Sequence, residues 1–345
     1  MVINMTKEHN NKIFNAKLKK DYLKDIVESG VVSESTAENY ERFFVKTANF
    51  EEKLKKDLNQ FTFEEMETVL FSFNAGNRHM IDVYARIISS YLNWSVKKGL
   101  SEKNVLAQLK TKDFEKYVVN KEEYITEKKM RRYEDMAENY QDSALLRLLF
   151  IGVNGKNLSE LRFLEKEDID FDKNLLKLKE VIEESKDGEP LKYKERYMSV
   201  DDRTIYLLRG AIEQRTYLKK NGNISQTANN VKPYIDLVDN KYVLRPTVSN
   251  NLNSKKPVNK HVLQQRLRVL ADSLGIDHLN SKFIQRSGMI YYASQLVENG
   301  NITKDDRQFV GERFNVKSYL NLRSYLTIEN IRRTYPEVFE GVDQN

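Results

Sequence analysis

The stretch Gly155-Lys156-Asn157-Leu158-Ser159-Glu160-Leu161, followed by Glu-Asp-Ile-Asp at 167–170, decides which fold the chain is expected to adopt. Asn157 and Glu160 stand three residues apart, the spacing of a capping box, in which side chains satisfy the free backbone donors at a helix start. A phosphate contact is a second role open to Asn157. The spacing predicts a short helix to Leu164, directly after an apolar helix.

Downstream of this stretch the pattern becomes extended and then helical again. The segments 175–181 and 192–200, with a Lys-Asp-Gly turn at 186–188, predict a β-hairpin. Further helices are predicted over about 202–220, 260–274, 282–298 and within 303–345. Residues 221–257 are rich in Asn, Ser and Lys and predict an irregular segment.

Upstream, capping boxes at 35–38 and 62–65 open two helices, and a longer helix is predicted from about Arg78 to Lys98. The fold class expected is therefore mainly α with a small β-hairpin or sheet. The predicted domains are a helical N-terminal domain over 1–110, a charged linker over 111–122 and a second domain over 123–345.

Composition narrows the possible functions. The chain has 345 residues with 57 Lys and Arg, 51 Asp and Glu, four His and no Cys. The lack of Cys excludes a disulfide framework, a Cys-based zinc site and a thiol nucleophile, and the scattered His predict neither a metal nor a cofactor. No apolar run approaches the ~18 residues of a membrane span, and no secretion signal is visible. A cytoplasmic, nucleoid-associated protein is expected.

Positive charge is concentrated in one part of the chain. Between Lys192 and Arg268 there are 16 Lys and Arg against 6 Asp and Glu, a balance of +10 where the whole chain has +6. Such a block is typical of a surface that binds phosphates. A solvated helical face plus a basic loop explains the same count, so the block alone does not decide between the two.

The stretch at 155–170 resembles the Gly-Leu-Arg-Ile-Ser-Glu-Leu…Glu-Asp-Ile-Asp box of tyrosine recombinases, the phage integrase family. Other segments are similar to that family in the same order. Residues 91–104 resemble the end of its core-binding domain, 124–126 the start of its catalytic domain, 175–200 its β-hairpin, 284–286 its His-x-x-Arg motif and 309–312 its Leu-Gly-His box. The resemblance implies a two-domain, integrase-like fold that clamps a DNA duplex.

The resemblance also implies what a catalytic site would need. Members of the family cleave DNA by attack of a Tyr hydroxyl on a phosphodiester, with two Arg clamping the phosphate and His and Lys moving protons. The second Arg is kept as Arg286, but the other matching positions carry Asn157, Phe283, Glu312 and, for the nucleophile, Asn321. Losing one donor to the transition state alone typically costs about 2.7–4 kcal/mol. The chain is therefore predicted to be an inactive tyrosine recombinase.

The alternative is an active recombinase with a shifted nucleophile. Tyr319 lies two residues before Asn321, and Tyr325 lies four after it. A slip of two residues on a helix turns a side chain by about 200°, which disfavours this hypothesis. The family's hairpin Lys matches either Lys192 or Lys194, and the sequence does not choose between them.

DNA-binding residues are expected on two helices and the hairpin. One face of the 260–274 helix is apolar, and the other offers Gln and Arg side chains that can pair with base edges in the major groove. An ordinary solvated surface is an equal alternative for the helix from Arg78, and a structural ion pair for Arg286. The residues expected to contact DNA are Asn77, Arg78, Arg86, Lys192, Lys194, Lys260, Gln264, Gln265, Arg268 and Arg286.

Together these features predict a sequence-specific double-stranded DNA-binding protein that keeps an integrase fold and lacks strand cleavage. The arrangement also resembles the integrase-fold lysogeny repressors of SPβ-type Bacillus prophages, which implies repression of lytic genes at short operator sites. A helical protein-interaction module, indifferent to DNA sequence, is the third possibility. A protein or peptide regulator is left open, and no membrane partner is expected.

Overall fold

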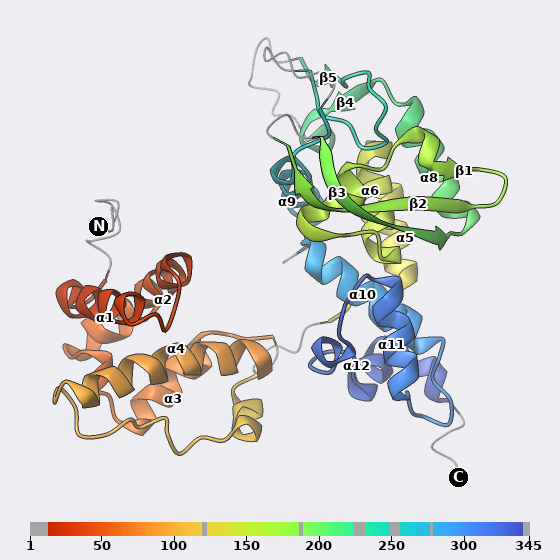
Figure 1. The fold of residues 1–345 in the computed structure, drawn as a ribbon. Coiled ribbons are helices and arrows are strands. Elements are labelled where there is room, and N and C mark those ends of the chain that lie inside the picture. The colour runs from red at the N-terminus through yellow and green to blue at the C-terminus, as the bar shows by residue number, and fades with distance from the viewer. Residues whose placement is uncertain are drawn as a thin grey trace. The chain divides into compact units, whose positions relative to one another are not determined.

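The computed structural model divides into two compact units between residues 122 and 123 (Figure 1). It describes residues 13–76, 78–118, 123–185, 189–223, 232–248, 256–276 and 279–340. Both units are built mainly from helices, and the second also contains small antiparallel sheets. The predicted fold class, mainly α with a small β-sheet, is confirmed.

Four α-helices form most of the N-terminal unit. They are α1 (Ala16–Glu28), α2 (Glu34–Leu54), α3 (Phe63–Ser72) and α4 (Arg78–Lys97), with the short 3-10 helix η2 (Leu58–Gln60) between α2 and α3. The capping box of Thr62 and Glu65 opens α3 as predicted. The box predicted at 35–38 is wrong, because α2 begins at Glu34 and its cap is Ser33, two residues before the predicted cap Ser35.

The core of this unit surrounds a buried lysine. Tyr22 and Tyr91 pack edge to face with ring centroids 5.2 Å apart, and Lys19 Nζ lies 4.4 Å from the centroid of the Tyr91 ring. Lys19 also donates to Glu51 and Asp57 at 2.8 and 2.7 Å. These carboxylates are required because an unpaired charge in a protein interior is strongly unfavourable.

The segment expected as a linker over 111–122 is partly structured. Its first residues form the 3-10 helix η3 (Thr111–Tyr117), in which Phe114 and Tyr117 are buried in the N-terminal core. Tyr117 also donates to Glu67 of α3 at 2.7 Å. The linker prediction is therefore wrong for this part, because burial of two aromatic side chains outweighs the charge of their neighbours. The end of the segment lies outside the described residues.

The C-terminal unit is organised around helix α6 (Tyr140–Ile151), whose residues from 141 onward are all buried. It packs against α5 (Glu127–Met136), α8 (Asp202–Glu213), α9 (Lys260–Leu274) and α10 (Ser281–Ser294). The remaining helices are α7 (Ser159–Arg162), α11 (Lys304–Arg313) and α12 (Ile328–Thr334), with 3-10 helices that include η7 (Tyr319–Leu322) and η8 (Pro336–Phe339). α9 matches the helix predicted over 260–274, and α10 matches the start of the helix predicted over 282–298 but ends four residues earlier, at Ser294.

A three-stranded antiparallel sheet has the order β1-β2-β3, formed by β1 (Ile169–Asp170), β2 (Leu175–Glu184) and β3 (Pro190–Ser199). Leu176 stands opposite Met198, and both are buried in the core. This is the predicted hairpin, whose expected turn at 186–188 lies outside the described residues.

A second sheet pairs β4 (Thr216–Leu218) with β5 (Tyr234–Asp236). The predicted helix over 202–220 therefore ends early, and the segment expected to be irregular contains a strand. Strands of three residues leave too little alternation for a sequence pattern to reveal them.

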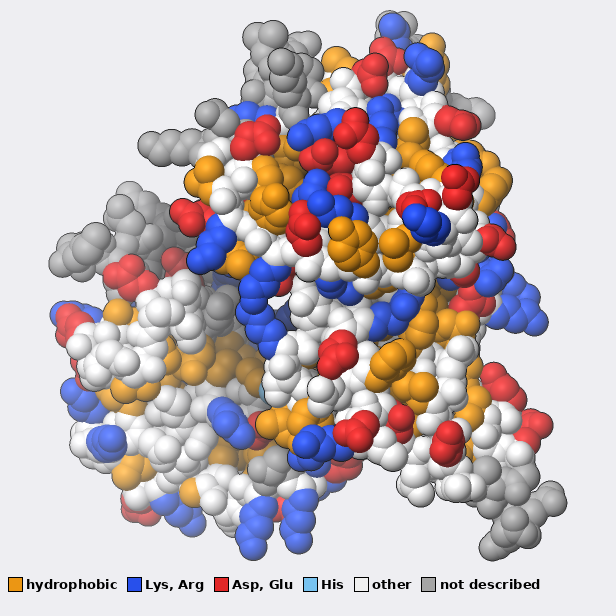
Figure 2. Space-filling model, turned by 45° about the vertical axis from the view of Figure 1, so that its right-hand side comes forward, with side chains coloured by type: hydrophobic (Ala, Val, Ile, Leu, Met, Phe, Trp, Pro, Cys, Tyr) orange, Lys and Arg blue, Asp and Glu red, His pale blue; other side chains and the backbone are white. Residues whose placement is uncertain are grey.

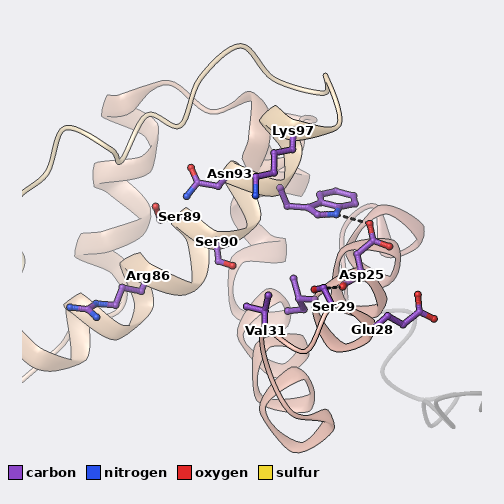
Figure 3. Close-up of a pocket in the computed structure, with 11 residues that line it drawn as sticks. Asp25, Glu28, Ser29, Val31, Arg86, Ser89, Ser90, Asn93 and Lys97 are labelled. Carbon is purple, nitrogen blue, oxygen red and sulfur yellow. Dashed lines mark hydrogen bonds between the residues drawn. The ribbon is translucent and has the colours of Figure 1, made fainter.

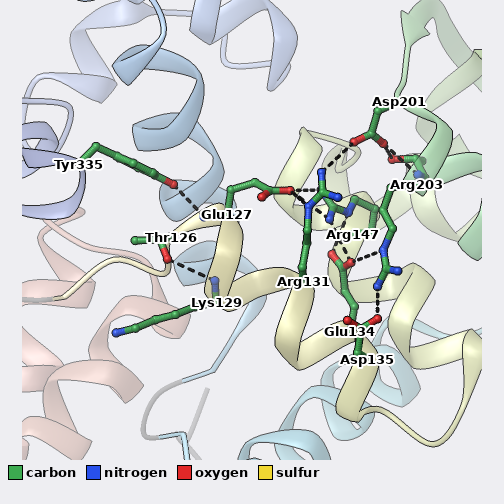
Figure 4. Close-up of polar contacts among 11 residues, drawn as sticks. Thr126, Glu127, Lys129, Arg131, Glu134, Asp135, Arg147, Asp201, Arg203 and Tyr335 are labelled. Carbon is green, nitrogen blue, oxygen red and sulfur yellow. Dashed lines mark hydrogen bonds and ion pairs between the residues drawn. The ribbon is translucent and has the colours of Figure 1, made fainter. Parts of the chain in front are cut away.

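An ionic cluster fastens α5, α6 and α8 together (Figure 4). Arg147 of α6 is buried and donates to Glu134 at 3.0 Å and to Glu127 at 3.3 Å. Glu134 also accepts from Arg203 of α8 at 3.1 Å. The Tyr335 hydroxyl accepts from the backbone N–H of Glu127 at 2.9 Å, which ties the C-terminal segment to the start of α5.

Candidate functional site

The stretch at 155–161, which decides the expected fold, forms a tight corner where α6 leads into α7. Asn157 and Leu158 have positive φ angles of 56° and 58°, and α7 begins without a side-chain cap. The Glu160 carboxylate instead accepts from the backbone N–H of Asn154 at 2.8 Å. The predicted capping box of Asn157 and Glu160 is therefore wrong. The chain adopts a left-handed conformation at Asn157, which asparagine tolerates, and the Asn157 side chain has another partner.

That partner is Lys260, the first residue of α9. Its Nζ donates to Asn157 Oδ1 at 3.0 Å. The pair lines a cavity of about 290 Å³, together with Lys156, Arg162 and His261 among other residues. Asn157 and Lys260 drew attention in the sequence for separate reasons, and the fold brings them into contact.

Glu160, three residues after Asn157, is the centre of a second contact. Arg196 of β3 donates to both Glu160 oxygens at 2.7 Å. It also donates to the backbone carbonyls of Gly152 and Arg313 at 2.8 and 2.7 Å. The Glu160 side chain is fully buried, and Arg196 is 22% exposed. The sequence does not reveal Arg196, because nothing in a strand of alternating charges marks the one cation that turns inward.

The positions matched to the His-x-x-Arg motif lie in the first turns of α10. Phe283 stacks on Tyr124 with ring centroids 6.0 Å apart. The Arg286 guanidinium lies 4.8 Å from the ring centroid of Tyr325, a cation–π contact. This aromatic contact is a structural role for Arg286 that the sequence does not show.

The remaining two matched positions lie at the surface. Glu312 of α11 is exposed and accepts from Gln308, one turn earlier, at 3.0 Å. Asn321 is exposed in η7. Neither side chain offers a phosphate a positive charge.

The two tyrosines considered as shifted nucleophiles differ in exposure. Tyr325 is buried, its hydroxyl donates to the Met289 sulfur at 2.9 Å, and burial raises the pKa of Tyr325 to about 12. An inaccessible hydroxyl that holds its proton tightly is a poor nucleophile. Tyr319 is only half-buried, and the cationic groups of Lys304 and Arg323 lie 5.4 and 5.1 Å from its ring centroid. Tyr319 is therefore the more accessible of the two.

Helix α9 presents the polar face that the sequence predicts. Gln264, Gln265 and Arg268 are exposed, while the opposite face is packed in the core. Arg266 lies on that buried face and donates to the backbone carbonyl of Arg245 at 2.7 Å. α9 thus combines a structural arginine with a row of exposed side chains capable of hydrogen bonding to bases.

The basic block at 192–268 is less available to a ligand than its charge count suggests. Four of its cations are engaged within the fold: Arg196 with Glu160, Arg203 with Glu134, and Arg245 and Arg266 with backbone carbonyls. Lys241 is exposed and pairs with Glu165 at the surface. Lys192 and Lys194 of β3 are exposed. Figure 2 shows one face of the molecule, where Lys and Arg lie among Asp and Glu rather than in one uniform positive surface. The count therefore overstates the surface that phosphates can reach.

In the N-terminal unit the expected DNA contacts lie at the start and in the middle of α4. Arg78 is exposed at the first position of the helix. Arg86 is also exposed and pairs with Asp82, one turn earlier, at 3.0 Å. Asn77 lies outside the described residues.

A cavity of about 790 Å³ is lined by residues of α1 and α4 (Figure 3). Asp25 and Glu28 come from α1, and Arg86 and Lys97 from α4. Within it the Trp94 indole N–H donates to Asp25 at 2.9 Å. The two carboxylates offset the two cations of the lining, so this cavity has no excess of positive charge that would favour a phosphate.

Two other kinds of site find no support in the described part of the chain. No three His, Asp or Glu side chains come together there as metal ligands. Each helix in those ranges is too short or too polar to cross a bilayer. What the described side chains offer is a set of cations and hydrogen-bonding groups on α9, β3 and α4.

Comparison with known proteins gives matches for both units. Residues 13–97 match the model of the MrpR N-terminal core-binding domain, and residues 124–336 match that of the MrpR C-terminal catalytic domain. The chain is 27% identical over 337 residues to the SPbeta prophage-derived uncharacterized protein YopR of Bacillus subtilis (strain 168), a match that covers 94% of this chain and 97% of YopR.

Among solved structures, a lambda integrase dimer bound to a COC' core site is similar with a TM-score of 0.50 and 10% identity, over 95% of this chain and 82% of that one. The Tn1549 transposon integrase in complex with a circular intermediate DNA has a TM-score of 0.47 and 12% identity, over 93% and 99%. The lambda integrase similarity shows a tyrosine-recombinase fold. Since the catalytic-domain model alone spans more than half of the chain, this integrase-fold protein belongs to the MrpR family.

Proposed function

We propose that this protein binds double-stranded DNA at specific sequences and represses phage or prophage transcription without cutting the strand. The observation that carries the proposal is the set of side chains at the expected catalytic positions, Asn157, Phe283, Glu312 and Asn321. They are two amides, a phenyl ring and an exposed carboxylate, in an integrase fold built to surround DNA.

These side chains are unsuited to strand cleavage. A phenyl ring neither gives nor takes a proton, and an amide is no replacement for a tyrosine nucleophile. A carboxylate at the position of Glu312 repels the phosphate it would serve. One lost donor costs about 2.7–4 kcal/mol of transition-state stabilisation, and the loss of several groups, though not additive, leaves no useful rate.

The surface of the protein supports DNA binding. Gln264, Gln265 and Arg268 on α9 are exposed and of the types that pair with base edges. Lys192 and Lys194 on β3, and Arg78 and Arg86 on α4, would add phosphate contacts that set affinity rather than sequence choice. The lambda integrase of similar fold was solved on its core-site DNA, which supports a duplex as the partner.

The proposed regulatory role rests on two points, the prophage origin of the similar protein YopR and the expected lack of strand cleavage. YopR is a prophage-derived protein, which supports a phage or prophage setting for this chain. A protein that occupies DNA without cutting it can regulate transcription by blocking the access of other proteins. Repression of lytic genes, which maintains lysogeny in the bacterial cytoplasm, is the function that fits both points.

The test is a pull-down of fragmented DNA from the source bacterium and its prophages with the full-length protein. Recovered fragments are sequenced, and a portion is run under denaturing conditions. We expect one short shared motif and complete release of DNA by the denaturant. Fragments without any shared motif would contradict sequence-specific binding and favour a protein-interaction module.

The same experiment decides the rival function, a recombinase with a moved nucleophile. Tyr319 is the better rival because it is accessible and has cations beside its ring. Its attack on a phosphodiester would form a phosphotyrosine bond and release a DNA hydroxyl. DNA that stays attached after denaturation, and is released in a Tyr319→Phe variant, would overturn the non-catalytic proposal.

A further inference from the structure

The cavity beside Asn157 contains cations that no carboxylate neutralises. It is formed by the loop before α7, the end of β2 and the start of α9. Lys156 is exposed at its edge, Lys260 is half-exposed, and His261 is exposed next to it. These groups surround a space of about 290 Å³, large enough to take a phosphate group with its water.

The charges lining this cavity separate into a paired and an unpaired set. Arg162 donates to both oxygens of Glu184, at 2.7 and 3.1 Å, so these two charges cancel. Lys260 is held by the Asn157 amide oxygen at 3.0 Å. An amide orients the ammonium group but carries no charge, so Lys260 keeps its full positive charge. Lys156 adds a second cation, and the cavity as a whole favours an anion.

We propose that this cavity binds one backbone phosphate of double-stranded DNA, with Lys260 as the residue that contacts it and Asn157 as the residue that positions Lys260. The inference rests on the proposed function and assigns a specific task to this part of the site. An ammonium group has three donors. One is directed to Asn157, which leaves two for the phosphate.

The proposal changes the role of Lys260 within α9. The sequence places Lys260 with Gln264, Gln265 and Arg268 as one DNA-reading face. Its place in the cavity gives Lys260 a different role from the other three residues, because a phosphate contact fixes position on the duplex and carries no sequence information. Lys260 therefore contributes affinity at any sequence, while the residues further along α9 select among sequences.

The experiment measures duplex binding by fluorescence anisotropy over a series of salt concentrations. Two probes are used, a fragment recovered in the pull-down and a random-sequence duplex of the same length. The variants are Lys260→Gln, which removes the charge, Lys260→Arg, which keeps it, and Asn157→Asp. The Asn157→Asp change keeps the shape of the side chain and places a carboxylate on Lys260. Lys173→Gln, at an exposed turn between β1 and β2, is the matched control.

We expect Lys260→Gln to reduce the salt slope of binding by about 0.9, the contribution of one phosphate, on both probes. The ratio of wild-type to variant affinity then falls about threefold between ~50 and ~200 mM salt. Lys260→Arg keeps the wild-type slope. Asn157→Asp weakens binding at least as much as Lys260→Gln, because its carboxylate neutralises Lys260. Lys173→Gln leaves the slope unchanged.

Three outcomes would overturn the proposal. A Lys260→Gln variant that weakens binding of the recovered fragment alone, with an unchanged slope, would make Lys260 a base-reading residue. An equal effect of Lys173→Gln would show a general charge effect. An unchanged slope combined with stronger inhibition of the wild type by inorganic phosphate at equal ionic strength would assign the cavity to a free anion.

Failure of the proposed function has a different signature. If the wild type binds both probes equally, sequence-specific repression fails, and the slopes on the random duplex still decide the phosphate contact. If the wild type binds neither probe at low salt, both proposals fall.

Discussion

Two contacts made by side chains three residues apart in the sequence use a cation in opposite ways. Glu160 accepts from Arg196 and Asn157 accepts from Lys260, and in each case the cation comes from a distant segment. The Glu160 contact is buried, charged on both sides and completed by two backbone carbonyls. The Asn157 contact is exposed and charged on one side. The comparison shows that a buried cation with a charged partner is used to stabilise the fold. A cation at the surface with a neutral partner remains available to a ligand.

The largest effect is expected at the buried contact. Replacement of Arg196 by Met leaves the Glu160 carboxylate buried without a counter-charge and should destabilise the C-terminal unit by about 3 kcal/mol. Urea unfolding followed by far-UV circular dichroism measures the change. Trp94 is the single tryptophan and lies in the N-terminal unit. Its fluorescence should therefore report an unfolding transition that the substitution leaves in place.

Lys194→Met is the matched control for this prediction. It removes a cation two residues earlier on the same strand, where the side chain is exposed. Its effect should stay within about 0.5 kcal/mol, as for most surface substitutions. Equal losses at Arg196 and Lys194 would show that burial does not distinguish the two cations.

A smaller effect should separate charge from sequence reading on α9. Gln264→Ala removes an exposed amide and no charge. We expect its affinity for the recovered motif to fall about tenfold, within the ~1–3 kcal/mol of one good base contact, with the salt slope unchanged. Competition between motif and random duplex measures this preference.

The control for Gln264 is Gln295→Ala, an exposed glutamine at the end of α10. This change should leave the preference for the motif unaltered. A Gln264→Ala variant that loses affinity equally for both duplexes would contradict base reading and place Gln264 among the backbone contacts.

Much of the fold follows from local sequence patterns. The Thr62–Glu65 capping box and the apolar spacing of α4 predict those helices because each rests on contacts within a few residues. The hairpin follows from the same kind of signal. The linker prediction fails at Phe114 and Tyr117, since the pattern does not tell an exposed aromatic from one buried by a distant helix.

The site is less predictable than the fold because its contacts join distant segments. Lys260 meets Asn157 across 103 positions, and Arg196 meets Glu160 across 36. The residue types at 157, 283, 312 and 321 could be judged from the sequence, since their chemistry does not depend on the fold. Whether a given cation is accessible to a ligand could not be judged from the sequence. Arg266 and Arg268, for example, are two residues apart on one helix, and only Arg268 is exposed.

The smallest effect is expected at a contact of a third kind, exposed and charged on both sides. Asp25 accepts from Lys98 at 2.8 Å and from the Trp94 indole at 2.9 Å. These donors, Lys98 first, lower the pKa of Asp25 below its usual value. A lowered pKa in the folded state means that the stabilisation is present above about pH 4 and is lost as the pH falls through the folded pKa.

Asp25→Asn should therefore cost only about 0.5 kcal/mol at neutral pH, because water and salt screen an exposed pair. Trp94 fluorescence is a direct readout, since the indole N–H loses a charged acceptor. The wild-type emission should change as the pH falls below the usual range of an Asp carboxyl, and the Asp25→Asn emission should not. A loss of stability as large as that of Arg196→Met would mean that a charged partner is enough, without burial, for a cation to stabilise the fold.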